Sequence, residues 1–201
     1  LAQRLGFLYI DTGAMYRAIT LKALWQGVDF KNEEALIDIA KNSRIDLKYS
    51  EDGAQINVFL EGKDVTEDIR HPRITQYVSF VAKIPGVRKI MLEFQRALGR
   101  KSDSVIEGRD IGTVVFPDAD KKFYLDASGE ERIRRRFKEL KMKGQAVSEK
   151  DIELDIKNRD KIDSSRECAP LRRAEDAIYV DTTNMSIEEV VEVLYKNIKD
   201  G

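Results

Sequence analysis

One stretch of the 201-residue chain, residues 105–117, limits most strongly what the chain can fold into. It opens with two β-branched residues, which suit a buried strand, and continues with Glu-Gly-Arg-Asp at 107–110. In open α/β sheets ligands bind outside the carboxyl ends of the strands, so these polar residues stand where a ligand would bind. Arg109 carries the planar fork of donors that suits phosphate, and Asp110 offers an acceptor beside it.

This stretch has two interpretations. Gly108 and Gly112 permit a close backbone approach or a positive φ, which fits a ligand site. An isolated acid-Gly-Arg-Asp sequence fits a polar turn with one surface ion pair equally well. The rest of the chain has to decide between them.

The hydrophobic pattern predicts an α/β fold with a mainly parallel sheet, because short apolar strands alternate with helices. Residues 44–64 differ: two alternating segments around the turn signal at 51–53 predict a small antiparallel β unit inserted into the chain. The expected strands of the sheet are 7–10, 105–106, 121–125 and 177–180. The expected helices are 1–5, 12–26, 32–43, 73–82, 85–99, one from Ser128, 148–166 and 186–199.

Serine followed three residues later by an acid predicts helix starts. Ser128 with Glu131 and Ser186 with Glu189 fit capping boxes, and Ser148 with Asp151 is a similar pair.

The segment 11–17, Asp-Thr-Gly-Ala-Met-Tyr-Arg, joins a strand to a helix and is the first candidate for an anion site. Free N–H groups point outward at such a helix start. Arg17 lies about one turn into the helix and would reach the same place. An ordinary capped helix with a solvated arginine is the alternative.

The helix from Ser148 carries a stripe at positions i, i+4, i+7, i+11 and i+14 that turns from apolar to ionic. Solvent contact is the simpler explanation on spacing alone, and a cleft is the other. The residues of the stripe are Ile152, Ile156, Arg159, Asp163 and Arg166.

Composition excludes several classes of function. The net charge of −1 produces no global field for nucleic acid, and glutamates interrupt the arginine run at 132–136. The single cysteine, Cys168, allows no disulfide framework and favours a reducing cytosol. No apolar run approaches the ~18 residues of a membrane span. Cysteine and histidine show no metal-ligand spacing.

Three segments together resemble bacterial cytidylate kinase: 11–17, 107–117 (Glu-Gly-Arg-Asp-Ile-Gly-Thr-Val-Val-Phe-Pro), and Arg159-Asp160 followed by Asp163 and Arg166. The resemblance covers essentially the whole chain. It implies a P-loop kinase fold with a mainly parallel sheet and flanking helices, a small antiparallel β/helical monophosphate-binding insert, and a helical lid. It also implies ATP-dependent phosphorylation of CMP and dCMP with Mg²⁺.

The resemblance implies a role for each matching residue. Arg17, Arg109 and Thr12 would bind the phosphate of CMP, and Arg159, Asp163 and Arg166 would lie at the ribose and nucleotide. The residues that would read cytosine are Ser79, Arg88 and Asp110. Arg132 and Arg135, on the lid, would neutralise the ATP phosphates, and Glu107 would orient Mg²⁺ through water. Arg109, Arg132, Arg135 and Glu107 form the expected catalytic set.

The resemblance also divides the chain. The core kinase domain would comprise 1–30, 85–127 and 151–201, with the insert at 31–84 and a mobile lid at 128–150. The family's phosphate loop, of the type GxxxxGK[ST], is not among the 201 residues and would lie before Leu1. We expect about 20 further residues upstream, comprising a strand, this loop and a helix start. Strands 104–107 and 121–125 are then expected not to pair directly.

The sequence therefore predicts a cytoplasmic monomer that binds CMP or dCMP and ATP, and neither nucleic acid nor membrane. A related monophosphate kinase with another base preference is the enzymatic alternative. The other alternative is a nucleotide-binding module that is inactive for lack of the phosphate loop.

Overall fold

The computed structural model describes residues 1–50 and 56–200, and the predicted turn at 51–53 lies outside them. The chain forms two compact units. One, the N-terminal unit, comprises residues 2–111, and the other, the C-terminal unit, comprises residue 1 and residues 112–201.

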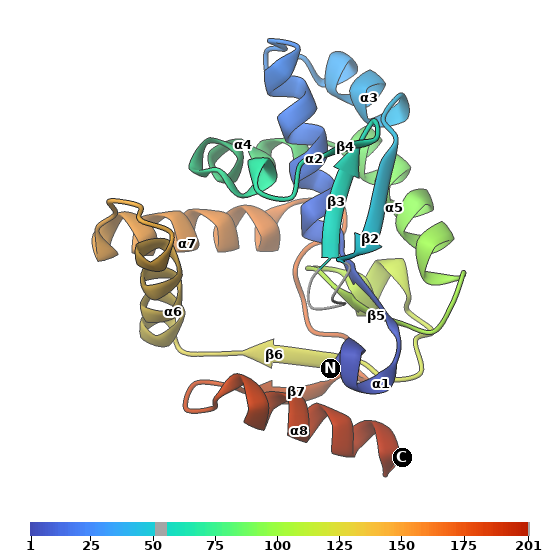
Figure 1. The fold of residues 1–201 in the computed structure, drawn as a ribbon, viewed down its shortest axis with the longest axis vertical. Coiled ribbons are helices and arrows are strands. Elements are labelled where there is room, and N and C mark those ends of the chain that lie inside the picture. The colour runs from blue at the N-terminus through green and yellow to red at the C-terminus, as the bar shows by residue number, and fades with distance from the viewer. Residues whose placement is uncertain (51–55, 201) are drawn as a thin grey trace. The chain divides into compact units, whose positions relative to one another are not determined.

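The N-terminal unit contains two of the expected sheet strands, five of the expected helices and the expected β insert (Figure 1). Its helices are α1 (Ala2–Leu5), α2 (Thr12–Trp25), α3 (Glu33–Lys41), the 3₁₀ turn η1 (Asp68–Arg70), α4 (Pro72–Ala82) and α5 (Pro85–Gly99). Its strands are β1 (Leu8–Asp11), β2 (Ile45–Tyr49), β3 (Ile56–Leu60), β4 (Lys63–Asp64) and β5 (Ser104–Glu107).

Strands β1 and β5 run parallel, and their last residues, Asp11 and Glu107, are partners in the register. Because the carboxyl ends of parallel strands meet at one edge, the two predicted polar segments lie side by side. Helix α2 begins directly after β1, with Asp11 as its N-cap: the Asp11 side chain accepts from the Ala14 amide at 2.9 Å. The structure therefore brings the segments that follow β1 and β5 to one edge of the sheet.

The core of the N-terminal unit surrounds α2, whose residues 14–16, 18, 19, 21 and 23 are buried. Glycines with positive φ follow α1 and α2, at Gly6 (70°) and Gly27 (64°). A positive φ costs glycine little, so these residues suit the ends of the two helices. Residues of α3, β2, β3, η1, α4 and α5, together with Val65 and Ile84, complete the buried cluster.

The insert folds as the antiparallel sheet β2-β3-β4, as its alternating pattern predicted. Tyr49, at the end of β2, reaches the outer edge of β1. Its hydroxyl accepts from the Tyr9 amide at 2.9 Å and donates to the Phe7 carbonyl at 2.7 Å. The insert is thereby hydrogen-bonded to the strand that leads into α2.

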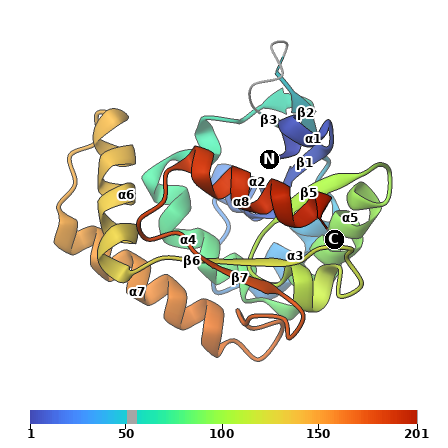
Figure 2. The same cartoon turned by 90° about the horizontal axis from the view of Figure 1, so that it is seen from below.

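The C-terminal unit is a two-stranded parallel sheet with helices (Figure 2). In order it contains the π-helical turn η2 (Ile111–Val115, which spans the boundary), β6 (Phe123–Asp126), α6 (Gly129–Met142), α7 (Glu149–Ser165), β7 (Ile178–Asp181) and α8 (Ile187–Lys199). Helix α8 lies beside β6 and β7 in both ribbon views, and α6 packs on α7. The π-helical turn was not predicted.

The helix starts agree with the sequence except in one detail. Ser186 and Glu189 form a complete capping box at α8. At α6 only half of the predicted box exists: Ser128 accepts from the Glu131 amide, but the Glu131 carboxylate accepts from Arg134 and Arg135. Two guanidinium donors outcompete one backbone amide because charge-assisted bonds are stronger.

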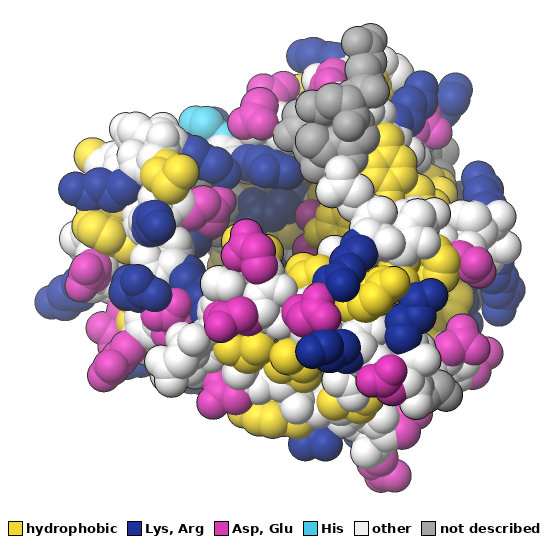
Figure 3. Space-filling view, turned by 60° about the horizontal axis from the view of Figure 1, so that its bottom comes forward, with side chains coloured by type: hydrophobic (Ala, Val, Ile, Leu, Met, Phe, Trp, Pro, Cys, Tyr) yellow, Lys and Arg dark blue, Asp and Glu magenta, His cyan; other side chains and the backbone are white. Residues whose placement is uncertain are grey.

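The chain is thus an α/β protein with parallel strand pairs and flanking helices. Within residues 1–50 and 56–200, β5 pairs with β1 and β6 with β7, and no ladder joins β5 to β6. No helix in the described part of the chain is long and apolar enough to cross a membrane. Figure 3 shows positive and negative side chains interspersed on the face that it draws.

Candidate substrate-binding site

The ends of β1 and β5 are in contact through Thr12 and Glu107. The buried Thr12 hydroxyl donates to the Glu107 carbonyl oxygen at 2.7 Å. A Cβ on Gly108 would lie 2.4 Å from Thr12 Oγ1 and 2.8 Å from Ile111 Cδ1. A Cβ at position 108 would collide with both side chains, so glycine is needed for the backbone to pass this close to them. Gly112 has more room, since its nearest neighbour is the flexible Lys122 side chain at 3.1 Å.

Two carboxylates and a phenol gather at this strand edge. The residue Glu107 is exposed, but surrounding protein dehydrates its carboxylate and raises its pKa, and the Asp11 charge adds to the rise. The Tyr9 hydroxyl donates a hydrogen bond to Glu107, and burial raises the pKa of Tyr9. Arg109, which is half-buried, opposes the shift of Glu107 with its positive charge. The edge therefore combines negative charge with the predicted phosphate-binding arginine.

Arg17 projects from α2 toward the part of the insert that follows its β-sheet. Its Nη1 donates to the Thr75 hydroxyl at 2.9 Å and to the Ile69 carbonyl at 3.2 Å. The alternative of an arginine surrounded by solvent is therefore wrong. Sequence reasoning missed both partners, which follow it by more than 50 residues.

Arg88 and Asp110 form a buried ion pair. Arg88 Nη2 donates to Asp110 Oδ2 at 2.5 Å, and Nη1 donates to the Ala82 carbonyl at 2.9 Å. The guanidinium also lies 5.7 Å from the centre of the Tyr16 ring. Because the partner of Asp110 is buried, the interpretation of 107–110 as a polar turn with a surface ion pair is wrong. The structure brings these two predicted base-reading residues together, and the third, Ser79, is buried on α4.

The ionic end of the α7 stripe is buried as well. The side chains of Asp163 and Arg166 are only 6% and 5% exposed, and their closest polar atoms are 3.5 Å apart. Arg159 Nε lies 3.8 Å from Asp163 Oδ2, and Arg166 Nε donates to the Ala169 carbonyl at 2.6 Å. A stripe directed into solvent is therefore the wrong explanation for Asp163 and Arg166. The structure brings all three predicted residues of this helix together.

The two arginines assigned to the lid have partners that the sequence did not indicate. Arg132 forms two hydrogen bonds with Asp160 on α7, at 2.7 and 2.9 Å. Arg135 donates to Glu131 at 2.7 Å and to the Thr182 hydroxyl at 3.1 Å, and also to the Thr182 carbonyl. Asp160 directly follows Arg159, so the predicted stripe on α7 already pointed to this part of the helix. No spacing pattern pointed to Thr182, the partner of Arg135.

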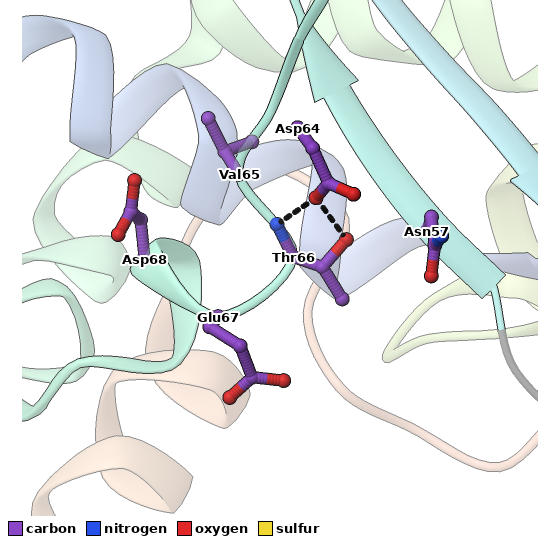
Figure 4. A pocket seen from close by; sticks show the side chains of 6 residues that line it. All are labelled: Asn57, Asp64, Val65, Thr66, Glu67 and Asp68. Atoms are coloured by element: carbon purple, nitrogen blue, oxygen red, sulfur yellow. Dashed lines mark hydrogen bonds between the residues drawn. The ribbon is translucent and has the colours of Figure 1, made fainter.

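One pocket of about 280 Å³ lies in the insert, and none of the residues that line it was predicted as a site residue (Figure 4). It is lined by Asn57, Asp64, Val65, Thr66, Glu67 and Asp68. Among the described residues no group of three or more His, Cys, Asp or Glu is arranged to hold a metal ion directly.

The fold and these residues define a class: an α/β protein that carries, in each of its two units, arginines of the kind that bind phosphorylated ligands, two of them with buried side chains. The family model "Cytidylate kinase" matches residues 1–200, and the chain belongs to this family. The predicted resemblance is thereby confirmed, and the chain is an enzyme of the phosphotransferase class.

Bacterial proteins named cytidylate kinase are similar to the chain along nearly its whole length. The protein of Caldanaerobacter subterraneus subsp. tengcongensis is 51% identical, and the matched region covers 99% of this chain and 86% of the relative. That of Oceanobacillus iheyensis is 49% identical, with 98% and 85% covered. That of Clostridioides difficile is 49% identical, with 98% and 88% covered.

Proposed function

We propose that this enzyme transfers the γ-phosphoryl group of ATP to CMP or dCMP, producing ADP and CDP or dCDP. Family membership supports the reaction, and the buried Arg88–Asp110 pair supports the choice of base. A carboxylate accepts several hydrogen bonds, so Asp110 suits the amino group of cytosine while it binds Arg88. Arg88 in turn suits the ring acceptors of the base.

The phosphate of CMP is assigned to Arg17, Arg109 and Thr12. Arg17 is already held by two acceptors, and Thr12 lies at the start of α2, where backbone N–H groups favour an anion. For the ribose and the nucleotide we propose Arg159, Asp163 and Arg166, which interact with one another on α7. Mutual contact holds their side chains in one arrangement before a ligand binds.

Arg132 and Arg135 are proposed to neutralise the ATP phosphates as parts of the lid at 128–150. Arg132 now binds the partly exposed carboxylate of Asp160. A triphosphate carries more negative charge than one carboxylate, so the nucleotide would compete for this guanidinium. We propose the domain division given above, with the insert at 31–84, on the same grounds of resemblance.

Glu107 and Asp11 fit the outer coordination of Mg²⁺. Their carboxylates end paired parallel strands, and oxygen ligands that act through retained waters are typical of this ion. The raised pKa of Glu107 fits a place where a cation would relieve negative charge. When bound with ATP, the ion would supply charge neutralisation for the transferred group.

The chemistry requires positioning rather than a covalent intermediate. Transfer to a CMP phosphate oxygen is a direct in-line displacement, for which oriented reactants and fixed positive charge provide most of the acceleration. Arg109 at the strand edge would bind the acceptor phosphate throughout. Tyr9, whose raised pKa keeps its hydroxyl protonated, would hold Glu107 in place.

A coupled assay for ADP on the intact gene product tests the reaction. With ATP and Mg²⁺ we expect turnover with CMP and dCMP that exceeds turnover with UMP and AMP. Equal or greater activity with another monophosphate would favour the related kinase. Nucleotide binding without any turnover would favour the inactive binding module.

Asp110→Asn tests the assignment of the base. Uracil presents an oxygen where cytosine presents its amino group, and an unpaired buried polar group costs about 1–3 kcal/mol. The variant is therefore expected to narrow the CMP to UMP ratio of kcat/KM by roughly tenfold or more. An unchanged ratio in a folded variant would assign base recognition to other residues.

A further inference from the structure

Thr75 touches the arginine to which we assign the phosphate of CMP. It stands on α4, whereas Arg17 stands on α2, and their hydrogen bond of 2.9 Å joins residues 58 positions apart. The same nitrogen, Nη1, donates to the Ile69 carbonyl at 3.2 Å. One terminal nitrogen of Arg17 is therefore held by two acceptors from the segment that follows the insert sheet.

Both acceptors have a fixed position. Ile69 supplies one acceptor and Ile74 precedes the other, Thr75. The two isoleucines are 1% and 2% exposed and belong to the buried cluster that surrounds α2. The Ile69 amide is in turn bonded to the Val65 carbonyl at 3.0 Å. Because the core holds this segment against α2, the acceptors define where the guanidinium lies.

An arginine side chain has several rotatable bonds, and binding an anion through it normally requires that most of them be ordered. Hydrogen bonds that exist before the ligand arrives remove that cost in advance. The Ile69 carbonyl belongs to the backbone and is common to any residue at that position. The Thr75 hydroxyl is the part of this support that depends on a side chain.

We propose that Thr75 is a positioning residue: its hydroxyl holds Arg17 in the orientation that binds the phosphate of the acceptor nucleotide. This inference rests on the proposed function of Arg17. Thr75 acts through Arg17 and not on the nucleotide. Its loss therefore weakens binding of CMP and leaves the binding of ATP unchanged.

Thr75→Val removes the acceptor and keeps the shape of the side chain. A hydrogen bond to a charged group is lost, so we expect KM and Kd for CMP to rise about five- to tenfold. The value of kcat should stay within about twofold and KM for ATP should not change, as for an interaction made equally in the ground and transition states. Thr75→Ser, which restores the hydroxyl, should return KM to the wild-type value.

Thr66→Val is the matched control. The Thr66 hydroxyl is also in the insert, but it accepts from the Val58 amide at 2.9 Å. It donates to Asp64 at 2.6 Å, as Figure 4 shows. This control should lower the unfolding temperature without raising KM for CMP. A KM increase of the same size in Thr66→Val would show a general effect of loosening the insert and overturn the inference.

A double-mutant cycle with Arg17→Lys separates the positioning role of Thr75 from the phosphate-binding role of Arg17. CMP affinity is measured by calorimetry, so that weak activity does not prevent the comparison. We expect Thr75→Val to have little further effect once Arg17 is replaced. Full additivity, or normal affinity in Thr75→Val, would overturn the positioning role. Normal affinity in Arg17→Lys and in Arg17→Met would instead refute the assignment of Arg17 itself. If Thr75→Val does not fold, Thr75→Ala undergoes the same cycle.

Discussion

The two units of the molecule are stabilised in different ways. The N-terminal unit contains the whole buried apolar cluster around α2, and its site arginines are held by carbonyls, a hydroxyl and a buried carboxylate. In the C-terminal unit, α6 and α7 carry ion pairs along partly exposed faces, and Met142 and Leu154 are exposed. The larger apolar core is thus in the N-terminal unit, whereas partly exposed ion pairs cover much of α6 and α7 in the C-terminal unit.

The difference bears on how each arginine can respond to a ligand. Arg88 and its partner Asp110 are 6% and 11% exposed at their side chains, so separating them would strand a charge in the interior. Arg132 and Asp160 are 37% and 33% exposed, and water can replace either partner. In the proposed function, a fixed frame would suit recognition of the acceptor nucleotide, and exchangeable pairs would suit a lid that opens and closes.

The largest effect is expected from Asp110→Ala. The variant leaves the Arg88 guanidinium buried without its carboxylate, which should cost about 3–5 kcal/mol of unfolding free energy. Urea denaturation of the variant and the wild type measures the difference. A loss below about 1 kcal/mol would mean that this pair behaves like a surface ion pair and would remove the contrast between the units.

Core truncation should have the next largest effect. Ile19 on α2 is completely buried, so Ile19→Ala should cost about 2–5 kcal/mol. Leu154→Ala on α7 is the control, because that side chain is 59% exposed and its loss should change stability by no more than about 0.5 kcal/mol. Denaturant midpoints that fall equally in the two variants would contradict the view that packing dominates the N-terminal unit.

Asp160→Ala should have a small effect that depends on salt. The pair with Arg132 has two good hydrogen bonds but is one-third exposed, so its loss should cost less than about 1 kcal/mol. The difference from the wild type should shrink further at 1 M salt, where exposed charges are screened. Thermal unfolding at low and high salt measures this stability difference. A large cost that does not depend on salt would mean that the pair behaves like the buried Arg88–Asp110 pair.

The smallest effects concern pH, and they should have opposite signs in the two units. The folded pKa of Glu107 is raised, chiefly by loss of hydration, so its stabilising contribution is present below about pH 4.3 and is lost as pH rises through the folded pKa. The two arginines beside Glu131 lower its pKa to about 2, so its contribution is present above about pH 4.3 and is lost as pH falls toward about 2.

Glu107→Gln and Glu131→Gln test this contrast. Between pH 7 and pH 4 the wild type should gain stability relative to Glu107→Gln. Between pH 5 and pH 3 it should lose stability relative to Glu131→Gln. Denaturation curves across this range measure both differences, and trends of the same sign would contradict the assigned causes.

Local sequence signals predicted helix ends well where a residue type at the end, such as proline or glycine, determines the backbone conformation. Proline at the first helical position and glycine at the last gave α5 its bounds of Pro85–Gly99. The π-helical turn at Ile111–Val115 was missed because four of its five residues are β-branched and the fifth is glycine, and such residues do not indicate a helix. Its conformation depends on tertiary contacts that no local pattern contains.

The candidate site could be predicted only in part for a similar reason. Spacing along α7 identified Arg159, Asp163 and Arg166, since one helix brings them together. The partners of Arg17 and Arg135 come from other elements, 58 and 47 residues away, so only the fold could reveal them. The proposed role of each site residue still rests on resemblance and stays a prediction.

The Tyr49 hydroxyl has a consequence for the association of this chain with others. β1 pairs with β5 on one side, and on the other side Tyr49 occupies the Tyr9 amide and the Phe7 carbonyl. These are two of the backbone groups that an extended segment of another molecule would need to add itself as a further strand. A single phenol thus closes part of an edge at which intermolecular sheet growth would otherwise begin.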